Sequence, residues 1–498
     1  MSDAADALFG HQEQVLILAA EECPLDRFDE LHKFTTSDEH IIRKLMAHGP
    51  VLLRGGRGSG KSAFLIEAYL RLRRALKGLV FPVYLSLRYL PLLRAEGSEY
   101  DRHFCKILSE KIEAELREQK VGATFVSTEN ISELHLNLQE LASQMDMRIV
   151  LLLDDAAHIG REHPQSEFFD IFRTVSTSAV SCKASIYPGV TKFGIRFDVY
   201  NDASVIDINR DERKKDYVNC FLQVMGARYV ELLSRVSKSR SIDQRLFALL
   251  FGRAVCGNMR AFIFTCNLLE EKRGVGYPEI TDCFLGMASN YYWPLLEEVA
   301  PKLGMYEPLI PLTEEIGRFL FEICAERNTS YVLIHREIMQ RFAKVFEILE
   351  YAGFIGKREA SRAMKSGGRG AVFAVNLCNL LDATVGRRLT LDQSQTWLST
   401  KDVAEVHSLN PRISGMQMPE LTEGGDLRVL KLPVDLLAKS RAYPYGLTED
   451  KITRLKDAGI STIGELAEAP DFKILSIEYI GRKNLKRIRD VQYQAIWM

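Results

Sequence analysis

The sequence has no long apolar run, no clustered cysteines and no excess of charge of one sign. Its longest purely apolar stretches, such as residues 15–20 and 149–153, fall far short of the roughly 20 residues that a transmembrane helix needs. Residues 1–6 are acidic and no apolar segment follows them, which argues against a secretory signal. We therefore expect a cytoplasmic protein with no membrane partner.

The charge balance and the cysteine spacing argue against further classes of protein. The 65 Lys+Arg residues against 66 Asp+Glu residues leave a net charge of −1, so any surface for nucleic acid must be local. The nine cysteines never lie closer than ten residues apart, and the ten histidines are equally dispersed. This scatter favours reduced, mostly buried thiols over a disulfide framework or a zinc site. We expect no metal that is held by protein ligands alone.

A length of 498 residues with 46% hydrophobic content predicts about three domains. Up to residue 210, short apolar strands alternate with helical patterns, which indicates an α/β fold with a parallel sheet. The expected strands cover 51–53, 79–85, 148–155, 184–187 and 204–208. The second of them contains Pro82, which cannot donate to a strand ladder, so this strand is predicted at the sheet edge.

The rest of the chain is mainly helical. Residues 211–287 show an all-helical pattern, and residues 288–395 end in the order helix, strand, basic loop, strand, which is typical of a winged helix. Residues 396–445 are rich in Pro and Gly and predict an irregular connector. Residues 446–498 return to compact helical patterning.

A glycine-rich segment between the first strand and the first long helix fits the P-loop pattern GxxxxGK[ST] in full. It consists of Gly55, Gly56, Arg57, Gly58, Ser59, Gly60, Lys61 and Ser62. Its glycines let backbone N–H groups face a phosphate, Lys61 reaches the β/γ oxygens, and Ser62 binds Mg²⁺. The segment therefore predicts ATP and Mg²⁺ as cofactors, against the alternative of a chance glycine-rich turn.

Two carboxylates end the buried strand at 148–155 and fit a Walker B strand. Asp154 is predicted to order the Mg²⁺ ligands, and Asp155 to act as the base that polarises the attacking water. ATP hydrolysis is therefore expected. It is expected to be slow, because aspartate is shorter than the glutamate common at this position. Two solvated carboxylates at a strand end are the alternative.

These motifs together resemble the AAA+ ATPases of the origin-recognition initiator type over roughly residues 28–285. The resemblance rests on the P-loop, the Asp-Asp strand, a strand followed by Pro188-Gly189-Val190-Thr191, and Gly257-Asn258-Met259-Arg260 in the helical segment. It implies an AAA+ core at 1–210, an all-α lid at 211–287, a winged-helix domain at 288–395 and self-association. It also implies that Arg260 is the sensor 2 arginine, although Met259 replaces the usual proline. Arg196 is similar to an arginine finger offered to a neighbouring subunit, with an arginine on a solvated turn as the alternative. Thr191 is the best match to sensor 1.

The basic stretch after the helix at 336–351 is a candidate DNA surface. It carries Lys357, Arg358, Arg362, Lys365 and Arg369 against one acid, Glu359. A mobile basic loop between two strands suits contacts to phosphates, which position a protein without reading sequence. A solvated loop on a protein-binding winged helix is the alternative.

Residues 446–498 resemble the helix-hairpin-helix domain at the C-terminus of the RNA polymerase alpha subunit. The resemblance rests on Gly459 to Leu466 and on Ile477 to Leu485, followed by a basic helix. It implies DNA contacts from Gly481, Lys483 and Asn484. Residues 482–489 contain five basic residues, among them Arg482 and Lys486, which makes them a candidate clamp for DNA phosphates. The arginine that enters the groove in that family corresponds to Asp450, so docking to a protein stays open as the alternative.

We therefore expect an ATP-dependent, oligomeric AAA+ switch that binds duplex DNA, nucleoid-associated in that case, with any effector chemistry in a partner protein. A signalling ATPase of the STAND type, whose C-terminal domains bind protein, is the alternative. A metabolic P-loop kinase is a distant third, because a lid and a sensor 2 arginine have no role there.

Overall fold

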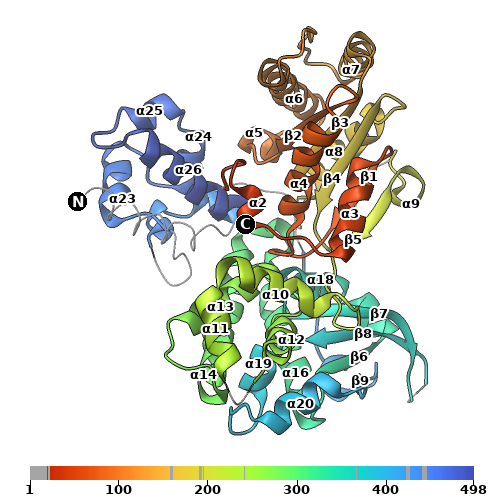
Figure 1. Ribbon diagram of the computed structural model, residues 1–498, viewed down its shortest axis with the longest axis vertical. Coiled ribbons are helices and arrows are strands. Elements are labelled where there is room, and N and C mark those ends of the chain that lie inside the picture. Colours follow the sequence, from red (N-terminus) through yellow and green to blue (C-terminus); the bar gives the residue numbers. More distant parts are fainter. Residues whose placement is uncertain are drawn as a thin grey trace.

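The computed structural model describes residues 20, 23–157, 161–189, 193–194, 196–239, 242–365, 367–421, 427–439 and 446–497. Figure 1 shows an upper lobe built around one sheet, a lower lobe that joins helices to a second sheet, and a small helical unit beside the upper lobe. No helix among the described residues is long and apolar enough to cross a membrane.

The upper lobe contains a five-stranded, fully parallel sheet in the order β2-β3-β4-β1-β5. Its strands are β1 (Val51–Arg54), β2 (Val80–Ser86), β3 (Arg148–Ala157), β4 (Val180–Ile186) and β5 (Ser204–Asp207). The predicted α/β class is confirmed. Strand β2 lies at the sheet edge, as Pro82 predicts, because proline has no N–H to give a second neighbour.

Helices cover both faces of this sheet, and the period of two along β3 separates two cores. Leu151 and Leu153 face one core, whereas Val150 and Leu152 face the other. The helices of the upper lobe are α2 (Phe28–Leu31), α3 (Thr36–Met46), α4 (Lys61–Ala75), α5 (Leu90–Arg94), α6 (Ser98–Gln119), α7 (Ile131–Met145), α8 (Glu162–Val175) and α9 (Val199–Asp202). All nine cysteines of the chain are unpaired, and eight of them are buried.

The helical segment that follows the sheet is confirmed. Its helices are α10 (Tyr217–Arg228), α11 (Val230–Lys238), α12 (Gln244–Ala254), α13 (Met259–Glu270) and α14 (Tyr277–Met287). The expected boundary between residues 287 and 288 lies inside continuous helix, because α14 leads through a π-helical turn at Ala288–Tyr292 into α15 (Trp293–Val299). One hydrophobic core spans both predicted domains, from Tyr187 to Met416.

The lower lobe also contains a second sheet in the order β7-β8-β6-β9. Its strands are β6 (Tyr331–His335), β7 (Ile355–Ala363), β8 (Arg369–Val375) and β9 (Ala404–Val406), and the accompanying helices are α16 (Ile310–Glu326), α17 (Arg336–Arg341), α18 (Ala343–Ala352), α19 (Leu377–Ala383) and α20 (Leu391–Ser399). The order helix, strand, loop, strand at α18-β7-β8 is confirmed. The predicted irregular connector is not irregular throughout, since β9 pairs in parallel with β6.

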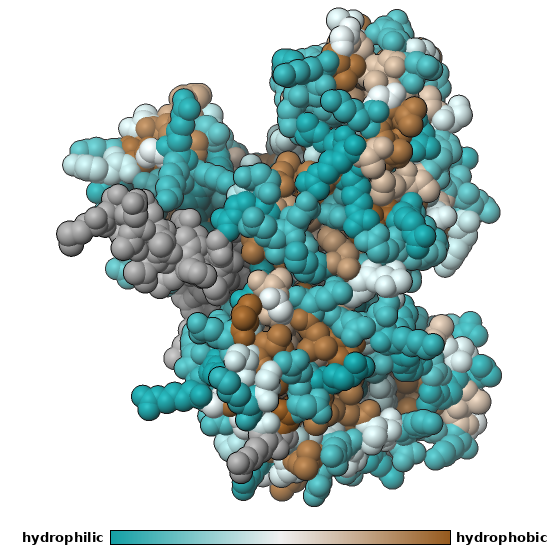
Figure 2. All heavy atoms as spheres, viewed as in Figure 1, coloured by the Kyte–Doolittle hydropathy of each residue, from teal (hydrophilic) through white to brown (hydrophobic). Residues whose placement is uncertain are grey.

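The small unit begins earlier than the sequence predicts. Leu427, Val429 and Val434 belong to the same core as Ile452 and Trp497, so we define the C-terminal unit as residues 427–439 and 446–497. Its helices are α22 (Arg428–Lys431), α23 (Glu449–Asp457), α24 (Ile463–Glu468), α25 (Asp471–Leu475) and α26 (Arg482–Trp497), with a 3-10 turn at Val434–Leu437. On the face shown in Figure 2, hydrophilic residues cover most of the surface, with hydrophobic residues in smaller groups between them.

Candidate nucleotide site

The P-loop joins β1 to the N-terminus of α4, as its motif requires. Gly58 and Gly60 have left-handed φ values of 80° and 100°, which favour glycine. A Cβ added at Gly58 would lie 2.6 Å from Cβ of Arg260, so this glycine also allows the lid to approach. The N–H of Arg260 donates to the carbonyl of Gly58 at 3.2 Å, which places the start of α13 directly on the P-loop.

A cavity lies between this loop and the lid. The residues that line it are Ala20, Leu31, His32, Lys33, Phe34, Gly58, Gly60, Lys61, Ser62, Ala63, Phe64, Arg88, Tyr187, Arg210, Val224, Arg228, Met259, Arg260 and Ile263. Six of these are lysines or arginines, and no carboxylate occurs among the described lining residues. Apolar side chains from α2, α10 and α13 form another part of the wall. An anion with an apolar portion therefore matches this cavity.

Lys61 lies in the cavity wall but is turned toward its own loop. Its ammonium donates to the carbonyls of Gly55 at 2.9 Å and Gly56 at 3.3 Å, and it lies 3.4 Å from the ring centroid of Tyr187. These contacts are replaceable, because a phosphate offers the ammonium a charge-assisted partner. Tyr187 lies one residue beyond β4 and carries no motif that the sequence could reveal.

The structure explains why Gly257 and Asn258 begin the lid segment Gly257-Asn258-Met259-Arg260. Gly257 has a φ of 80°, and a Cβ there would lie 2.7 Å from the carbonyl oxygen of Arg210. Asn258 caps α13 by accepting from the N–H of Ala261, and its amide donates to the carbonyl of Arg57. Arg260 follows in the first turn of α13 and lines the cavity. The sequence thus places this arginine correctly beside the P-loop.

The two carboxylates at the end of β3 are buried and have different partners. Asp154 accepts from the hydroxyls of Tyr84 at 2.9 Å and Ser185 at 2.5 Å, so neighbours on β2 and β4 hold it. Asp155 has a left-handed φ of 54° and forms an ion pair with Arg88 at 2.6 Å, with 2% of its side chain exposed. Asp154 is oriented by hydroxyl donors, whereas Asp155 is neutralised by a cation.

Not every residue of the P-loop motif faces the cavity. The guanidinium of Arg57 pairs instead with Glu298 of α15 at 2.9 Å, and its N–H donates to the carbonyl of Tyr351 at 3.0 Å. The motif predicts that this segment binds nucleotide, and the Arg57 side chain is not among the described lining residues of the cavity. Burial alone would raise the pKa of Glu298, but Arg57 and Lys302 outweigh it and hold this pKa at about 2.

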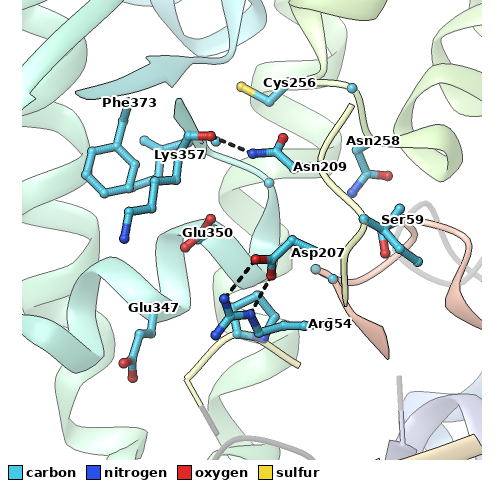
Figure 3. Close-up of a pocket in the computed structure, with 18 of the residues that line it drawn as sticks. Arg54, Ser59, Asp207, Asn209, Cys256, Asn258, Glu347, Glu350, Lys357 and Phe373 are labelled. Carbon is cyan, nitrogen blue, oxygen red and sulfur yellow. Dashed lines mark hydrogen bonds and ion pairs between the residues drawn. The ribbon is translucent and has the colours of Figure 1, made fainter. Parts of the chain in front are cut away.

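The outer side of the P-loop borders a second cavity of about 540 Å³, between the two lobes (Figure 3). Gly55, Gly56 and Ser59 line it from the loop. Its charged groups are largely satisfied by the protein: Arg54 donates to Asp207 at 2.5 and 2.9 Å, and the amide of Asn209 donates to the carbonyl of Lys357. This cavity therefore matches a seam between two lobes better than a site for a charged ligand.

Two further sequence-predicted residues lie outside the nucleotide cavity. Arg196 is exposed, its N–H donates to Asp170 at 3.0 Å, and it is not among the described lining residues. Thr191, the sensor 1 candidate, falls outside the described residues. Sequence reasoning missed Arg88, Arg210 and Tyr187, because each reaches the site from an element whose own sequence shows no motif.

The basic stretch 357–369 is mostly strand rather than a mobile loop, since β7 continues to Ala363. Lys357, Lys365 and Arg369 are exposed, and Arg362 pairs with Glu359 at 2.5 Å. Arg358 is wrongly predicted as a phosphate contact: its side chain is fully buried and pairs with Glu212 at 2.8 Å. That pair ties β7 to the segment that precedes α10.

In the C-terminal unit, the predicted contacts lie at the start of α26. Arg482, Lys483 and Lys486 are exposed, and the amide of Asn484 donates to the carbonyl of Tyr479 at 3.0 Å. A Cβ at Gly481 would meet nothing within 4 Å, so nothing within the described chain requires glycine there. Asp450, which stands where the related family has an arginine, accepts from Arg454 at 2.9 Å.

The comparisons with known proteins give only solved structures. No protein-family model and no curated protein matches the chain. The chain is similar to Cdc6p from Pyrobaculum aerophilum, with 13% identity, a TM-score of 0.32, and 70% of this chain and 91% of that chain covered. It is also similar to a structure of Drosophila ORC bound to DNA, with 11% identity, a TM-score of 0.33, and 75% and 90% covered. A third is the Aeropyrum pernix ORC2 protein, with 11% identity, a TM-score of 0.32, and 75% and 98% covered. The fold described above rests on strand order and contacts, not on these scores.

Proposed function

We propose that this chain is an AAA+-type switch that binds and hydrolyses ATP, binds duplex DNA and self-associates. The observation that carries the proposal is the cavity beside the P-loop, with six lysine or arginine side chains and no carboxylate among its described lining residues. The positive charge favours a triphosphate, and the helix N-terminus of α4 adds N–H donors at the same place. The apolar wall offers contacts to a base.

The residues present fit a nucleotide with its metal. Lys61, Ser62 and Arg260 line the cavity, where Lys61 and Arg260 would bind phosphate oxygens. Ser62, together with Asp154 on β3 outside the described lining, would hold Mg²⁺. Bound Mg²⁺ neutralises the charge that develops on the phosphates during transfer. Ser185 and Tyr84 keep the Asp154 carboxylate in one orientation. Asp155 accepts a proton from the attacking water once Arg88 no longer neutralises it.

The DNA surface that we propose is smaller than the sequence predicts. It comprises Lys357, Lys365 and Arg369 around the β7-β8 hairpin, and Arg482, Lys483 and Lys486 at the start of α26. Cations at a helix N-terminus oppose the helix dipole, and a phosphate bound there would compensate this cost. Arg358 has no place in this surface, because it is buried against Glu212.

The test is ATP turnover with and without duplex DNA at low salt. We expect DNA to stimulate hydrolysis, and we expect nucleotide to strengthen DNA binding. Binding of ATP without any binding of duplex DNA would reject the DNA half of the proposal and keep the nucleotide half.

One observation favours a signalling ATPase with a protein ligand as the second candidate. The C-terminal unit exposes large apolar side chains: Phe472 is 76% exposed, Tyr479 is 73% exposed and Leu475 is 38% exposed. Such side chains suit a protein partner better than a phosphate backbone. In this case, Phe472→Ala would weaken the binding of the partner, and charge reversal at Lys483 would not.

A further inference from the structure

The C-terminal unit is docked on the upper lobe beside α5 (Figure 1). Leu90 and Leu93 of α5 pack against the hydrophobic core of this unit, and Arg94 of α5 pairs with Glu468 of α24. The contact is therefore partly apolar and partly ionic. It joins the end of the chain to the segment that follows β2.

Arg161 anchors the last turn of α26. Its guanidinium donates to the carbonyl of Ile496 at 2.7 Å, and its central carbon lies 4.3 Å from the ring centroid of Trp497. Arg161 is 6% exposed and Trp497 is 5% exposed, so both are removed from water. Burial lowers the pKa of Arg161 to about 10, which leaves it charged at neutral pH.

Only some N–H groups of the Arg161 guanidinium have a hydrogen-bond acceptor. Within the described part of the chain, Nε and Nη1 of Arg161 are buried and have no hydrogen-bond partner. A buried arginine whose N–H groups lack acceptors carries a desolvation cost. Undocking of α26 would return that guanidinium to water. Water would then replace the Ile496 carbonyl as its hydrogen-bond partner and would also satisfy the N–H groups that lack an acceptor.

Arg88 connects Asp155 to the segment on which the C-terminal unit docks. It pairs with Asp155 at 2.6 Å, and Asp155 lines a small cavity together with Arg161 and Trp497. Arg88 follows β2 and immediately precedes the α5 region that the C-terminal unit covers. The position of Arg88 is therefore fixed by Asp155, and the docked unit acts on it through α5, whose Leu90 lies two residues further along the chain.

We propose that the docked C-terminal unit restrains ATP hydrolysis, with Arg161 as the clasp of α26 and Arg88 as the positioning residue that keeps Asp155 neutralised. The inference rests on the proposed ATPase function. While the Arg88 pair persists, the buried Asp155 carboxylate cannot polarise a water. Release of α26 frees the α5 segment, and with it Arg88, so that Asp155 becomes available.

The geometry of α26 also explains how a ligand could cause the release. The helix has 16 residues, which at about 1.5 Å per residue is roughly 24 Å. Its exposed basic end, Arg482 and Lys483, lies at one end of this rod and the Arg161 clasp at the other. A ligand that holds the basic end in a new position therefore moves the end that contacts the core.

The experiment uses the full-length chain and compares Trp497→Ala and Arg161→Gln with the wild type. We expect basal kcat to rise about 3- to 10-fold in both variants. ATP affinity should stay unchanged, because neither residue is among the described lining residues of the nucleotide cavity. Arg161→Lys keeps a cation near the Trp497 ring and a donor for the Ile496 carbonyl, so it should restore most of the restraint. Leu436→Ala removes an apolar side chain that is 50% exposed on the same unit and is the matched control, with no change expected.

The outcomes separate this inference from the proposed function. A variant that only destabilises the protein would lower ATP affinity, kcat and the melting temperature. In that case Arg161→Lys would not restore the wild-type behaviour. If Trp497→Ala and Arg161→Gln both turn over ATP at the wild-type rate, the proposed restraint is wrong and the proposed ATPase function is unaffected. Absence of ATP binding in every variant would overturn the proposed function itself.

Discussion

Arg57, a residue of the P-loop motif, forms a partly buried ion pair with Glu298 of α15 at 2.9 Å. The loop that is expected to hold the nucleotide is thereby tied to the lower lobe, and Lys302 joins the pair at 3.0 Å. A Cβ at Gly56 would lie 3.0 Å from the carbonyl oxygen of Glu350, so the end of α18 is also in contact with the loop. The P-loop therefore contacts both α15 and α18 of the lower lobe directly.

The Glu298 pair predicts a defined acid sensitivity. The pKa of Glu298 is held at about 2, below its ordinary value of 4.5, because Arg57 and Lys302 outweigh the effect of burial. A carboxyl whose pKa is lower when folded stabilises the protein above the ordinary value, and loses this contribution as the pH falls toward the lowered one. We expect the free energy of unfolding to fall between about pH 4.5 and pH 2.

Glu298→Gln should lower stability at neutral pH and flatten that acid dependence, as measured by denaturant unfolding at several pH values. Glu314→Gln, which breaks an exposed pair with Arg318 on α16, is the control and should change little. If the two variants show the same pH profile, the Arg57–Glu298 pair does not control acid stability.

Lys61→Ala is expected to abolish ATP binding. Lys61 is the only cationic side chain of the motif that lines the cavity, since Arg57 turns toward Glu298. Titration with a fluorescent ATP analogue measures the loss. Lys44→Ala, at an exposed position on α3, is the control. Equal affinity in the Lys61 variant and the wild type would show that nucleotide does not bind at this loop.

Asp155→Asn should leave ATP binding largely intact and slow hydrolysis by about 10-fold or more. The amide keeps the shape of the carboxylate but is a weaker proton acceptor. The substitution also removes the ion pair with Arg88, so a role in restraint alone would predict faster turnover. Single-turnover hydrolysis therefore decides whether Asp155 is the base, and undiminished turnover would exclude it.

The sequence predicted the features that are encoded locally. The P-loop, the buried Asp-Asp strand and the edge position of β2 follow from residue types within short segments, such as Pro82. The partners of these residues could not be predicted, because they come from distant elements: Arg57 meets Glu298 and Arg358 meets Glu212. A basic residue in sequence looks the same whether it is solvated or buried against a distant carboxylate.

The same reason explains the errors at domain boundaries. Gly and Pro residues after residue 396 indicated an irregular connector, but β9 finds its partner in β6, about 70 residues earlier. Leu427 to Leu437 are short apolar segments with weak local preference, and the core of the C-terminal unit orders them. The conformation of such segments depends on burial in the tertiary structure, which sequence periodicity does not reveal.

Arg260→Ala and Arg196→Ala should differ in how they depend on assembly. Arg260 lines its own cavity, so its loss should weaken the response of a monomer to ATP. Arg196 is exposed and outside that cavity, so its loss should impair only assembled subunits. Mixing the Arg196 variant with Lys61→Ala should restore some turnover, because some interfaces then pair an intact arginine with an intact P-loop. No recovery at any mixing ratio would count against a role of Arg196 in trans.

DNA binding should weaken steeply with salt, at a slope of roughly −0.9 per phosphate that the protein neutralises on a duplex. Charge reversal at Lys357, Lys365 and Arg369 should flatten the slope of log affinity against log salt by up to roughly 3. The triple reversal at Arg482, Lys483 and Lys486 should do the same. Arg358 is left unchanged, because reversal of a fully buried charge opposite Glu212 would disrupt the fold rather than test binding.

The matched control reverses three exposed lysines elsewhere, Lys44, Lys77 and Lys106, and so changes the net charge equally. A purely long-range effect of net charge would weaken binding in all three triple variants alike. Phosphate contacts would weaken it only in the first two, and to a similar degree on duplexes of different sequence, because such contacts position the protein without reading bases. With Asp450 at the expected arginine position, each surface alone should bind weakly. The ATP-assembled oligomer should bind more tightly, because several surfaces then engage one duplex.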